Sequence, residues 1–210
     1  MYRSAEVYAE EATAVCELGF SAYKYRPALG PDEDLRTVEL MRQALGPNIG
    51  ICLDAHGWWR MGDNSYAPST IEEIARAIAP FGVTWLEEPL PIEDRLAYSK
   101  LRSKGIVPIA AGEHEHDLEG FELLIENGAV DVAQADVSHH GGFSGVAEII
   151  RLCERNEVTL LENPMAVRHL LEQSEACKEF SQPLGFGGDY HVIEDFAQGI
   201  KNQAGTVLTP

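Results

Sequence analysis

The sequence predicts a parallel α/β fold, a (β/α) barrel of the TIM type formed by a single domain that spans residues 1–210. Short β-rich runs alternate with amphipathic stretches of helical length along the chain. Several of these runs are apolar nearly throughout, which is typical of parallel strands covered on both faces. An open, doubly wound sheet is the structural alternative. No GxGxxG motif follows the first strand, so a dinucleotide-binding sheet has no support.

Six runs have the length and composition of strands. In chain order they are residues 20–25, 49–54, 82–88, 106–113, 130–136 and 158–162. Six strand–helix units, with weaker signals at both ends, approach the eight units of a closed barrel. We therefore expect a barrel that is incomplete at strands one and eight.

Amphipathic stretches with helical spacing separate these runs. They are residues 6–19, 32–46, 69–82, 94–105, 118–128 and 145–156. All but one end at Gly and the last ends at Asn, the residues that favour a left-handed C-cap. Ser69 is followed three residues later by Glu72, a capping-box pattern that predicts Ser69 as the N-cap of its helix.

Composition restricts the class of partner and the compartment. The net charge of −18 argues against nucleic acid or an anionic membrane as a partner, and 45% hydrophobic residues suffice for a core. The four cysteines form no CxxC pair and lie in apolar segments, which is typical of buried free thiols in a reducing cytosol. The N-terminus lacks a signal-peptide pattern, and no apolar run approaches the ~20 residues of a membrane span. We expect a cytoplasmic protein.

Carboxylates stand at the ends of successive predicted strands. Asp54, Glu87 and Glu113 each follow an apolar run, and Asp136 ends the next one. The carboxyl ends of parallel barrel strands open onto one face, so the first three should converge there. Mg²⁺ prefers oxygen ligands of this kind. By strand alternation Glu88 should face away from Glu87, where it would pair with a cation or cap the next turn.

Nearly the whole chain resembles the barrel domain of the enolase superfamily, in the mandelate racemase and muconate-lactonising branch. The resemblance rests on "LDAHG", "WLEEPL", "PIAAGEHE" and "ADVSHHGG" in that order, and "GEHEHDLEGF" is similar to acid-sugar dehydratases such as rhamnonate dehydratase. It implies that Asp54, Glu87 and Glu113 hold Mg²⁺. The metal would clamp the substrate carboxylate and stabilise the enediolate that forms when the α-proton leaves.

The resemblance implies a base at the first predicted strand. The family commonly has Lys-x-Lys there, and this chain has Lys24, Tyr25 and Arg26. Arginine stays protonated, so Arg26 would bind a substrate carboxylate. Lys24 lies on the same strand face and could act as base if its pKa falls. The alternative is that Lys24 and Arg26 form an electrostatic clamp for an anion.

The remaining catalytic roles carry over less evenly. The family places a His on its seventh strand, oriented by the residue that matches Asp136, but this chain has Glu162 near that position. Asp136 and Glu162 are therefore the further catalytic candidates. His56, which follows the Asp54 strand end, and His114 and His116, in the dehydratase-like motif, are expected to bind substrate.

Other aromatic residues near the strand ends are less specific. His139 and His140 follow the fifth run, and either is more typical of a surface or structural histidine than of a catalyst. Trp58 and Trp59 either wall the pocket or cover the rim, and the sequence leaves the choice open.

The implied function is that of a Mg²⁺-dependent lyase that dehydrates a sugar acid. A racemase, epimerase or cycloisomerase of the same superfamily, and a truncated metal-binding remnant without catalysis, are the alternatives. Family members carry an N-terminal α+β capping domain, and residues 1–4 resemble the tail of the first barrel strand, so we expect this chain to lack the cap. Homo-oligomerisation stays open.

Overall fold

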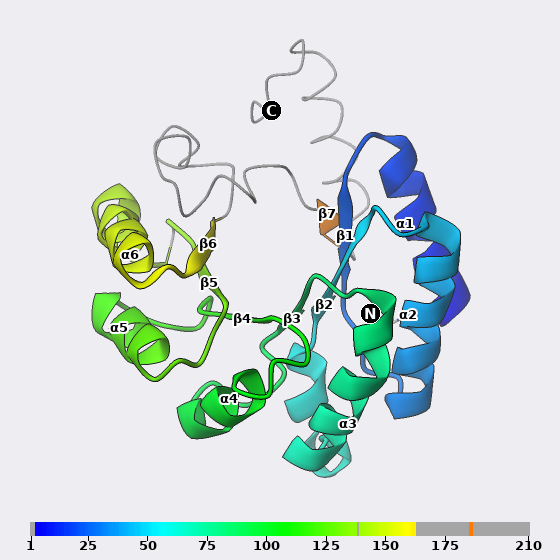
Figure 1. Cartoon of the computed structure of the whole chain (residues 1–210), viewed down its shortest axis with the longest axis horizontal. Helices are drawn as coiled ribbons and strands as arrows, with labels where there is room; N and C mark the ends of the chain where they lie inside the picture. The colour runs from blue at the N-terminus through cyan, green and yellow to red at the C-terminus, as the bar shows by residue number, and fades with distance from the viewer. Residues whose placement is uncertain (1–2, 138, 163–184, 187–210) are drawn as a thin grey trace. The chain divides into compact units, whose positions relative to one another are not determined.

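A computed structural model describes residues 3–137, 139–162 and 185–186. The chain divides into two compact units, residues 1–91 with 183–210 and residues 92–182. Each unit alternates strands and helices (Figure 1). In the part of the chain that the structure describes, no helix has both the length and the apolar character needed to cross a membrane.

The first unit contains three α-helices and four strands among its described residues. They are α1 (Ala5–Glu17), β1 (Ala22–Tyr25), α2 (Pro31–Leu45), β2 (Gly50–Asp54), α3 (Pro68–Ile78), β3 (Trp85–Glu87) and β7 (Gly185–Phe186). Short 3₁₀ helices, η1 (His56–Trp59), η2 (Gly62–Asn64) and η3 (Ala79–Phe81), flank α3.

The strands of this unit are parallel. β1 pairs with β2 and with β7, and β2 pairs with β3. The register sets Lys24 opposite Cys52 and Asp54 opposite Glu87. Because side chains two residues apart on a strand share a face, Lys24, Asp54 and Glu87 belong to one face of the sheet. The register alone therefore brings the Lys24 amine and two carboxylates together.

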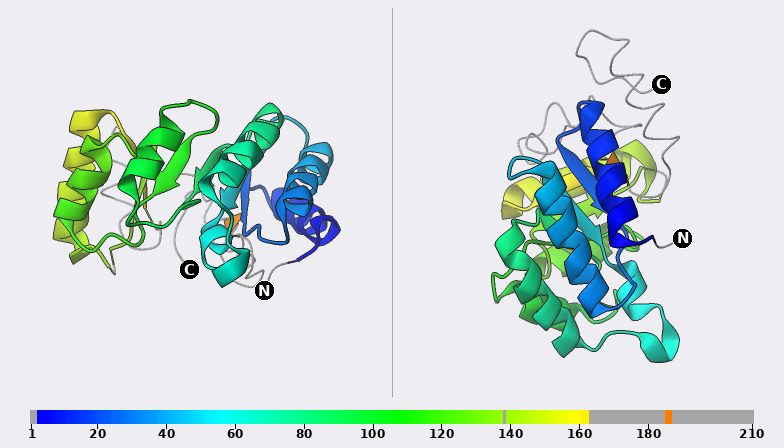
Figure 2. Two further views of the ribbon diagram at one scale, coloured as in Figure 1. Left: turned by 90° about the horizontal axis from the view of Figure 1, so that it is seen from below. Right: turned by 90° about the vertical axis from the view of Figure 1, so that its right-hand side faces the viewer.

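Apolar side chains hold the helices against these strands. α1 packs on α2 and β1, and α2 packs on α3 and β2, with the helices outside the strands (Figure 1; Figure 2). Val15, Val38, Met41, Ile51 and Ile78 are fully buried between these layers. Burial of such side chains contributes about 1.5–3 kcal/mol each, which supplies a rigid support for the polar strand ends.

The second unit has three strand–helix pairs among its described residues. They are α4 (Arg95–Arg102), β4 (Ile109–Ala111), α5 (Leu118–Glu126), β5 (Val132–Ala135), α6 (Gly142–Asn156) and β6 (Thr159–Glu162). β5 lies between β4 and β6, and both pairings are parallel. α5 and α6 pack against each other, and α6 also packs on β5 and β6.

The parallel α/β class is confirmed, and all six predicted strands are present, each one or more residues shorter than expected. The N-cap prediction was wrong. α3 begins at Pro68, and its N-cap is Ala67 without a side-chain hydrogen bond. Proline fits the first helical position because its fixed φ is helical and its missing N–H is not needed there. Ser69 is consequently inside the helix. Most of the chain after β6, where the eighth barrel strand was expected to be incomplete, lies outside the described residues.

Candidate active site and metal centre

Two buried carboxylates end adjacent strands of the first unit. Asp54 is the last residue of β2 and Glu87 the last of β3, and their relative exposures are 1% and 0%. The apolar runs before them extend the strands, and the parallel register sets the two residues side by side. Burying carboxylates is costly unless positive charge and hydrogen bonds compensate them, so their partners matter most.

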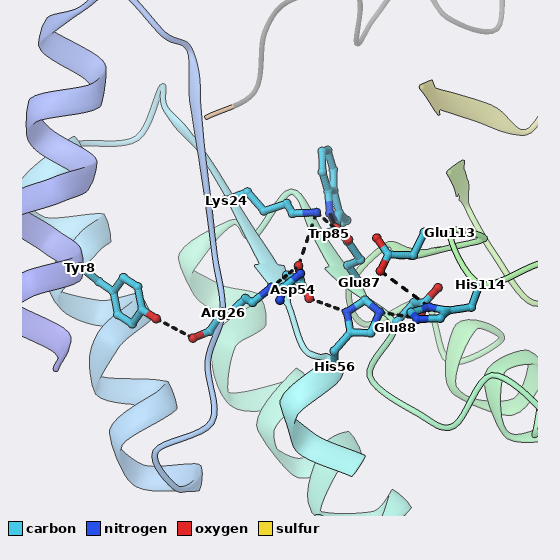
Figure 3. A network of polar contacts seen from close by, with 10 residues as sticks. All are labelled: Tyr8, Lys24, Arg26, Asp54, His56, Trp85, Glu87, Glu88, Glu113 and His114. Atoms are coloured by element: carbon cyan, nitrogen blue, oxygen red, sulfur yellow. Dashed lines mark hydrogen bonds and ion pairs between the residues drawn. The ribbon is translucent and has the colours of Figure 1, made fainter. Parts of the chain in front are cut away.

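Lys24 of β1 supplies the nearest positive charge. Its Nζ lies 2.6 Å from Oε1 of Glu87 and 3.6 Å from Oδ2 of Asp54 (Figure 3). The lysine is itself buried, at 8% relative exposure. The indole Nε1 of Trp85 donates to Oε2 of Glu87 at 3.2 Å, so both oxygens of this carboxylate have a partner.

Arg26 contacts the other carboxylate. Its Nε donates to Oδ2 of Asp54 at 2.9 Å, while 59% of its side chain is exposed. The hydroxyl of Tyr8 donates to the backbone carbonyl of Arg26 at 2.8 Å and so fixes the chain where it leaves β1. The guanidinium of Arg26 is thus anchored on buried Asp54 and partly exposed to solvent, where it could bind an anion.

The pKa of Asp54 reflects these neighbours. Burial acts to raise the pKa of its carboxyl, but the hydrogen bond from His56 and the charges of Lys24, His56 and Arg26 outweigh burial and lower it well below its ordinary value. Asp54 is therefore held as a carboxylate, the form in which it can bind a cation.

His56 bridges two carboxylates. Its Nδ1 lies 2.5 Å from Oδ1 of Asp54, and its Nε2 lies 2.7 Å from Oε2 of Glu88. Glu88 is fully buried, and Nε1 of Trp59 donates to its carbonyl at 2.8 Å. Glu88 was expected to pair with a cation or to cap the next turn, and its partner is the His56 imidazole. The strand-alternation argument does not apply to it. β3 ends at Glu87, and Glu88 has a left-handed φ of 39°, so its side chain reaches the histidine that contacts Asp54.

The donor set suits a divalent cation. Ligand atoms of Asp54, His56 and Glu87 all lie within 4.8 Å of one another, and all three residues are buried. Two carboxylates provide oxygen ligands of the kind that Mg²⁺ prefers, and the imidazole adds a nitrogen. Lys24 contacts the same two carboxylates in this structure, so the lysine and a cation would share them.

Glu113 belongs to the second unit. It follows β4 directly after Gly112, whose φ is 138°. A Cβ at Gly112 would lie 2.6 Å from the carbonyl oxygen of Gln134, so only glycine lets the chain turn there. The Glu113 side chain is 39% exposed, and its Oε1 lies 3.7 Å from Nδ1 of His114.

The three residues that follow Glu113 differ in how far they are exposed. His114 is half-buried and His116 is exposed. Glu115 is buried, and Nη2 of Arg95 donates to both of its oxygens at 2.9 and 2.7 Å. An ion pair that sequence reasoning did not identify therefore joins the dehydratase-like motif to Arg95, the first residue of α4.

Asp136 is half-buried, and its backbone has a defined partner. Its N–H donates to Nδ1 of His140 at 2.7 Å, and Nε2 of His140 donates to the carbonyl of Glu115 at 2.8 Å. Because Nδ1 accepts, the proton of this buried imidazole resides on Nε2. His140 is consequently a structural histidine that joins the segments after β4 and β5.

Glu162 ends β6 in register with Ala135 of β5. Its side chain lies outside the described residues. His169, Glu179 and Ser181, polar residues further along the chain, also lie outside the described residues.

Residues 7–161 match the family model described as enolase C-terminal domain-like. The chain is 32% identical over 143 residues to D-galactarolactone cycloisomerase of Agrobacterium fabrum, which covers 68% of this chain and 36% of that protein. It is 31% identical over 160 residues to L-rhamnonate dehydratase of Saccharopolyspora erythraea, which covers 72% of this chain and 39% of that one. The chain thus spans less than half the length of these two relatives.

Solved structures show the same relationship. The crystal structure of a 3,6-anhydro-D-galactonate cycloisomerase from Zobellia galactanivorans matches with a TM-score of 0.75 at 27% identity, over 91% of this chain and 54% of that one. A mandelate racemase/muconate lactonizing enzyme from a marine actinobacterium, crystallised in complex with magnesium, matches with a TM-score of 0.71 at 28% identity, over 87% and 49% of the two chains.

Proposed function

The chain belongs to the enolase C-terminal domain-like family, and from this membership we propose that it is the barrel domain of a Mg²⁺-dependent sugar-acid dehydratase. The observation that carries the proposal is the contact of Lys24 with Glu87 and Asp54 at the ends of adjacent strands. It provides a buried amine and two oxygen ligands on one face of the sheet. The similarity to an L-rhamnonate dehydratase supports a hydroxylated carboxylate as substrate.

Asp54 and Glu87 would hold the metal, with Glu113 as the third carboxylate that the family resemblance implies. When bound, Mg²⁺ would neutralise the substrate carboxylate and the negative charge that develops on it. The donor set fits a divalent cation because Asp54 and Glu87 are buried and end neighbouring strands.

Lys24 is the proposed base. The C–H bond next to the substrate carboxylate breaks, its proton passes to Nζ of Lys24, and the electron pair moves toward the carboxylate. The β-hydroxyl then leaves with a proton from an acid group as water, and the resulting enol tautomerises to a 2-keto-3-deoxy acid. Burial favours the neutral amine that this step needs, whereas the negative charges of Glu87 and Asp54 favour the ammonium. A divalent cation bound to these carboxylates would offset their charge and so favour the neutral amine.

Arg26 is the proposed partner of the substrate's carboxylate or hydroxyl groups, because its guanidinium is largely exposed while Nε stays anchored on Asp54. His114 and His116 are proposed to contact the hydroxyl groups, whereas His56, expected from the sequence to bind substrate, has both ring nitrogens on Asp54 and Glu88 and is proposed to hold these carboxylates in place. Asp136 and Glu162 are the proposed source of the acid. A cytoplasmic location stays the prediction drawn from the cysteines.

Racemisation, epimerisation or cycloisomerisation is the second candidate. It shares the removal of the α-proton, and the similarity to two cycloisomerases favours it. A metal-binding remnant without turnover is the third. The first two differ in what happens after the proton leaves, and the third removes no proton, so one set of measurements distinguishes them.

The test is a screen of sugar acids with Mg²⁺ that measures the 2-keto-3-deoxy product and, in D₂O, deuterium incorporation at the α-carbon. Product formation that Lys24→Met abolishes supports the dehydratase. Deuterium incorporation without dehydration favours the second candidate. Metal binding with neither reaction selects the remnant and rejects the proposal.

A further inference from the structure

Asp34 is a buried carboxylate that no step of the proposed function uses. It lies in the first turn of α2 at 2% relative exposure. Its Oδ1 accepts hydrogen bonds from the backbone N–H groups of Ala28 at 3.0 Å and Leu29 at 3.1 Å. Its Oδ2 accepts from Nε1 of Trp58 at 2.8 Å and from the hydroxyl of Tyr66 at 3.0 Å.

The four donors come from two loops that follow adjacent strands. Residues 26–30, the Arg26 loop, follow β1, and residues 55–67, the Trp58 loop, follow β2. The Trp58 loop begins next to Asp54 and contains His56. Each oxygen of Asp34 binds one loop, so a single carboxylate connects the two segments that carry Arg26 and His56.

Internal contacts make the Trp58 loop a rigid partner. The N–H of Tyr66 donates to the carbonyl of Trp58 at 2.6 Å, and their rings lie 5.6 Å apart. Trp58 is fully buried. No part of its indole is therefore exposed to solvent. Its indole N–H donates to Asp34 and so anchors the Trp58 loop to α2.

The Arg26 loop is held in a conformation that it would not adopt freely. Ala28 has a φ of 152°, a region that favours glycine, and it is buried. Its N–H and that of Leu29 converge on one oxygen of Asp34. Such backbone strain persists only where surrounding contacts enforce it, and Asp34 provides two of them.

Only a carboxylate satisfies all four donors. Two backbone N–H groups and an indole N–H cannot reverse their polarity, so both oxygens must accept. Burial raises the pKa of Asp34, while the hydrogen bonds from Leu29, Tyr66, Trp58 and Ala28 act to lower it. An asparagine would keep the bonds to the Arg26 loop on its oxygen but would set an amide N–H against the indole N–H of Trp58.

We propose that Asp34 is a positioning residue that fixes the Arg26 loop against the Trp58 loop, so that Arg26 and His56 meet at Asp54. The proposal rests on the proposed function for its catalytic consequence, and on the hydrogen bonds alone for its structural one. Asp34 acts through these two residues and does not touch the substrate.

The test compares Asp34→Asn with Ile78→Val, a core change at the far end of α3. In ¹⁵N-labelled protein, we expect Asp34→Asn to speed solvent exchange of the Trp58 indole N–H and the Arg26 Nε–H by about tenfold or more. The indole loses its carboxylate acceptor, and Arg26 keeps its bond to Asp54 but loses the contact that fixes its loop against the Trp58 loop. Ile78→Val should leave both rates within about twofold of the wild type at a temperature where all variants are folded. Equal changes in both variants, or none in either, would overturn the proposal.

A second variant separates positioning from general destabilisation. Trp58→Phe removes the indole N–H that opposes the new amide, so exchange at Arg26 in Asp34→Asn/Trp58→Phe should be slower than the two single effects combined. Additive effects would contradict the role of the Trp58 contact. Where turnover is measurable, Asp34→Asn should raise KM more than it lowers kcat, since Arg26 is a binding group. If the wild type lacks turnover, the proposed function fails, while the exchange rates still judge Asp34.

Discussion

The amine of Lys24 lies 2.6 Å from the Glu87 carboxylate, and both side chains are buried on β1 and β3, the strands on either side of β2. The strand between them ends in Asp54, whose carboxylate lies within 3.6 Å of the same amine. The relationship follows from register, because residues paired on neighbouring strands, and residues two apart on one strand, face the same way. It sets the chemistry of the face, since the proposed base and two proposed metal ligands compensate one another.

We expect Lys24→Met to destabilise the metal-free protein by about 3–5 kcal/mol, because it leaves the buried Glu87 carboxylate without its ion-pair partner. Mg²⁺ should then raise the melting temperature more in Lys24→Met than in the wild type, since the cation replaces the lost charge. Thermal unfolding with and without Mg²⁺ measures both effects. A smaller Mg²⁺ effect in the variant would indicate that the amine and the cation do not share the carboxylates.

Arg26→Gln should behave differently. The arginine side chain is 59% exposed, so its ion pair with Asp54 should contribute at most about 1 kcal/mol to folding. We expect weaker binding of a sugar acid with little change in unfolding by urea. A large loss of stability with unchanged binding would assign Arg26 to structure and remove it from the site.

The pH dependence of the metal-free protein should include a contribution from Asp54. Its folded pKa is lowered, so its stabilisation is complete above the ordinary Asp pKa of about 3.9 and is lost as pH falls through the lower folded value. Asp54→Asn should therefore show a shallower loss of stability below about pH 4 than the wild type. Urea unfolding across this range checks the slopes, and parallel curves would contradict the lowered pKa.

His140 and His116 form a matched pair in the second unit. His140→Leu removes the acceptor of the Asp136 N–H and the donor to the Glu115 carbonyl, so it should cost about 1–3 kcal/mol. His116→Leu changes an exposed side chain and should stay within about 0.5 kcal/mol. Chemical denaturation of both variants tests the assignment, which equal losses would refute.

The C-terminal ends of the strands were predicted well from the sequence. An apolar run marks a buried strand, and the first charged residue after it marks where the strand leaves the core. Strand length was overestimated where glycine changes direction. Gly82 and Gly112 have φ values of 63° and 138°, so β3 begins after the first and β4 ends before the second. Both glycines were visible in the sequence as turn signals within apolar runs.

The contacts of Glu88 and Asp34 were not predictable in the same way. Glu88 reaches His56 because its own backbone is left-handed directly after β3. Asp34 joins two loops that are far apart in the chain, through contacts with Ala28 in one and Tyr66 in the other. Neither arrangement has a period or a local motif, since both depend on tertiary packing. A buried-facing Asp in the first turn of a helix was the one available signal, and it also fits an ordinary helix-dipole interaction.

The most direct test of the account is calorimetric titration of Mg²⁺ into the wild type and into Asp54→Asn, Glu87→Gln and Glu113→Gln. Glu93→Gln, which changes an exposed carboxylate, serves as the control. Loss of a ligand should weaken Mg²⁺ binding by about tenfold or more in each of the three variants, because a hard cation depends on charged oxygen ligands. The control should bind like the wild type. Equal heats for the wild type, the three ligand variants and the control would contradict a metal centre at these strand ends.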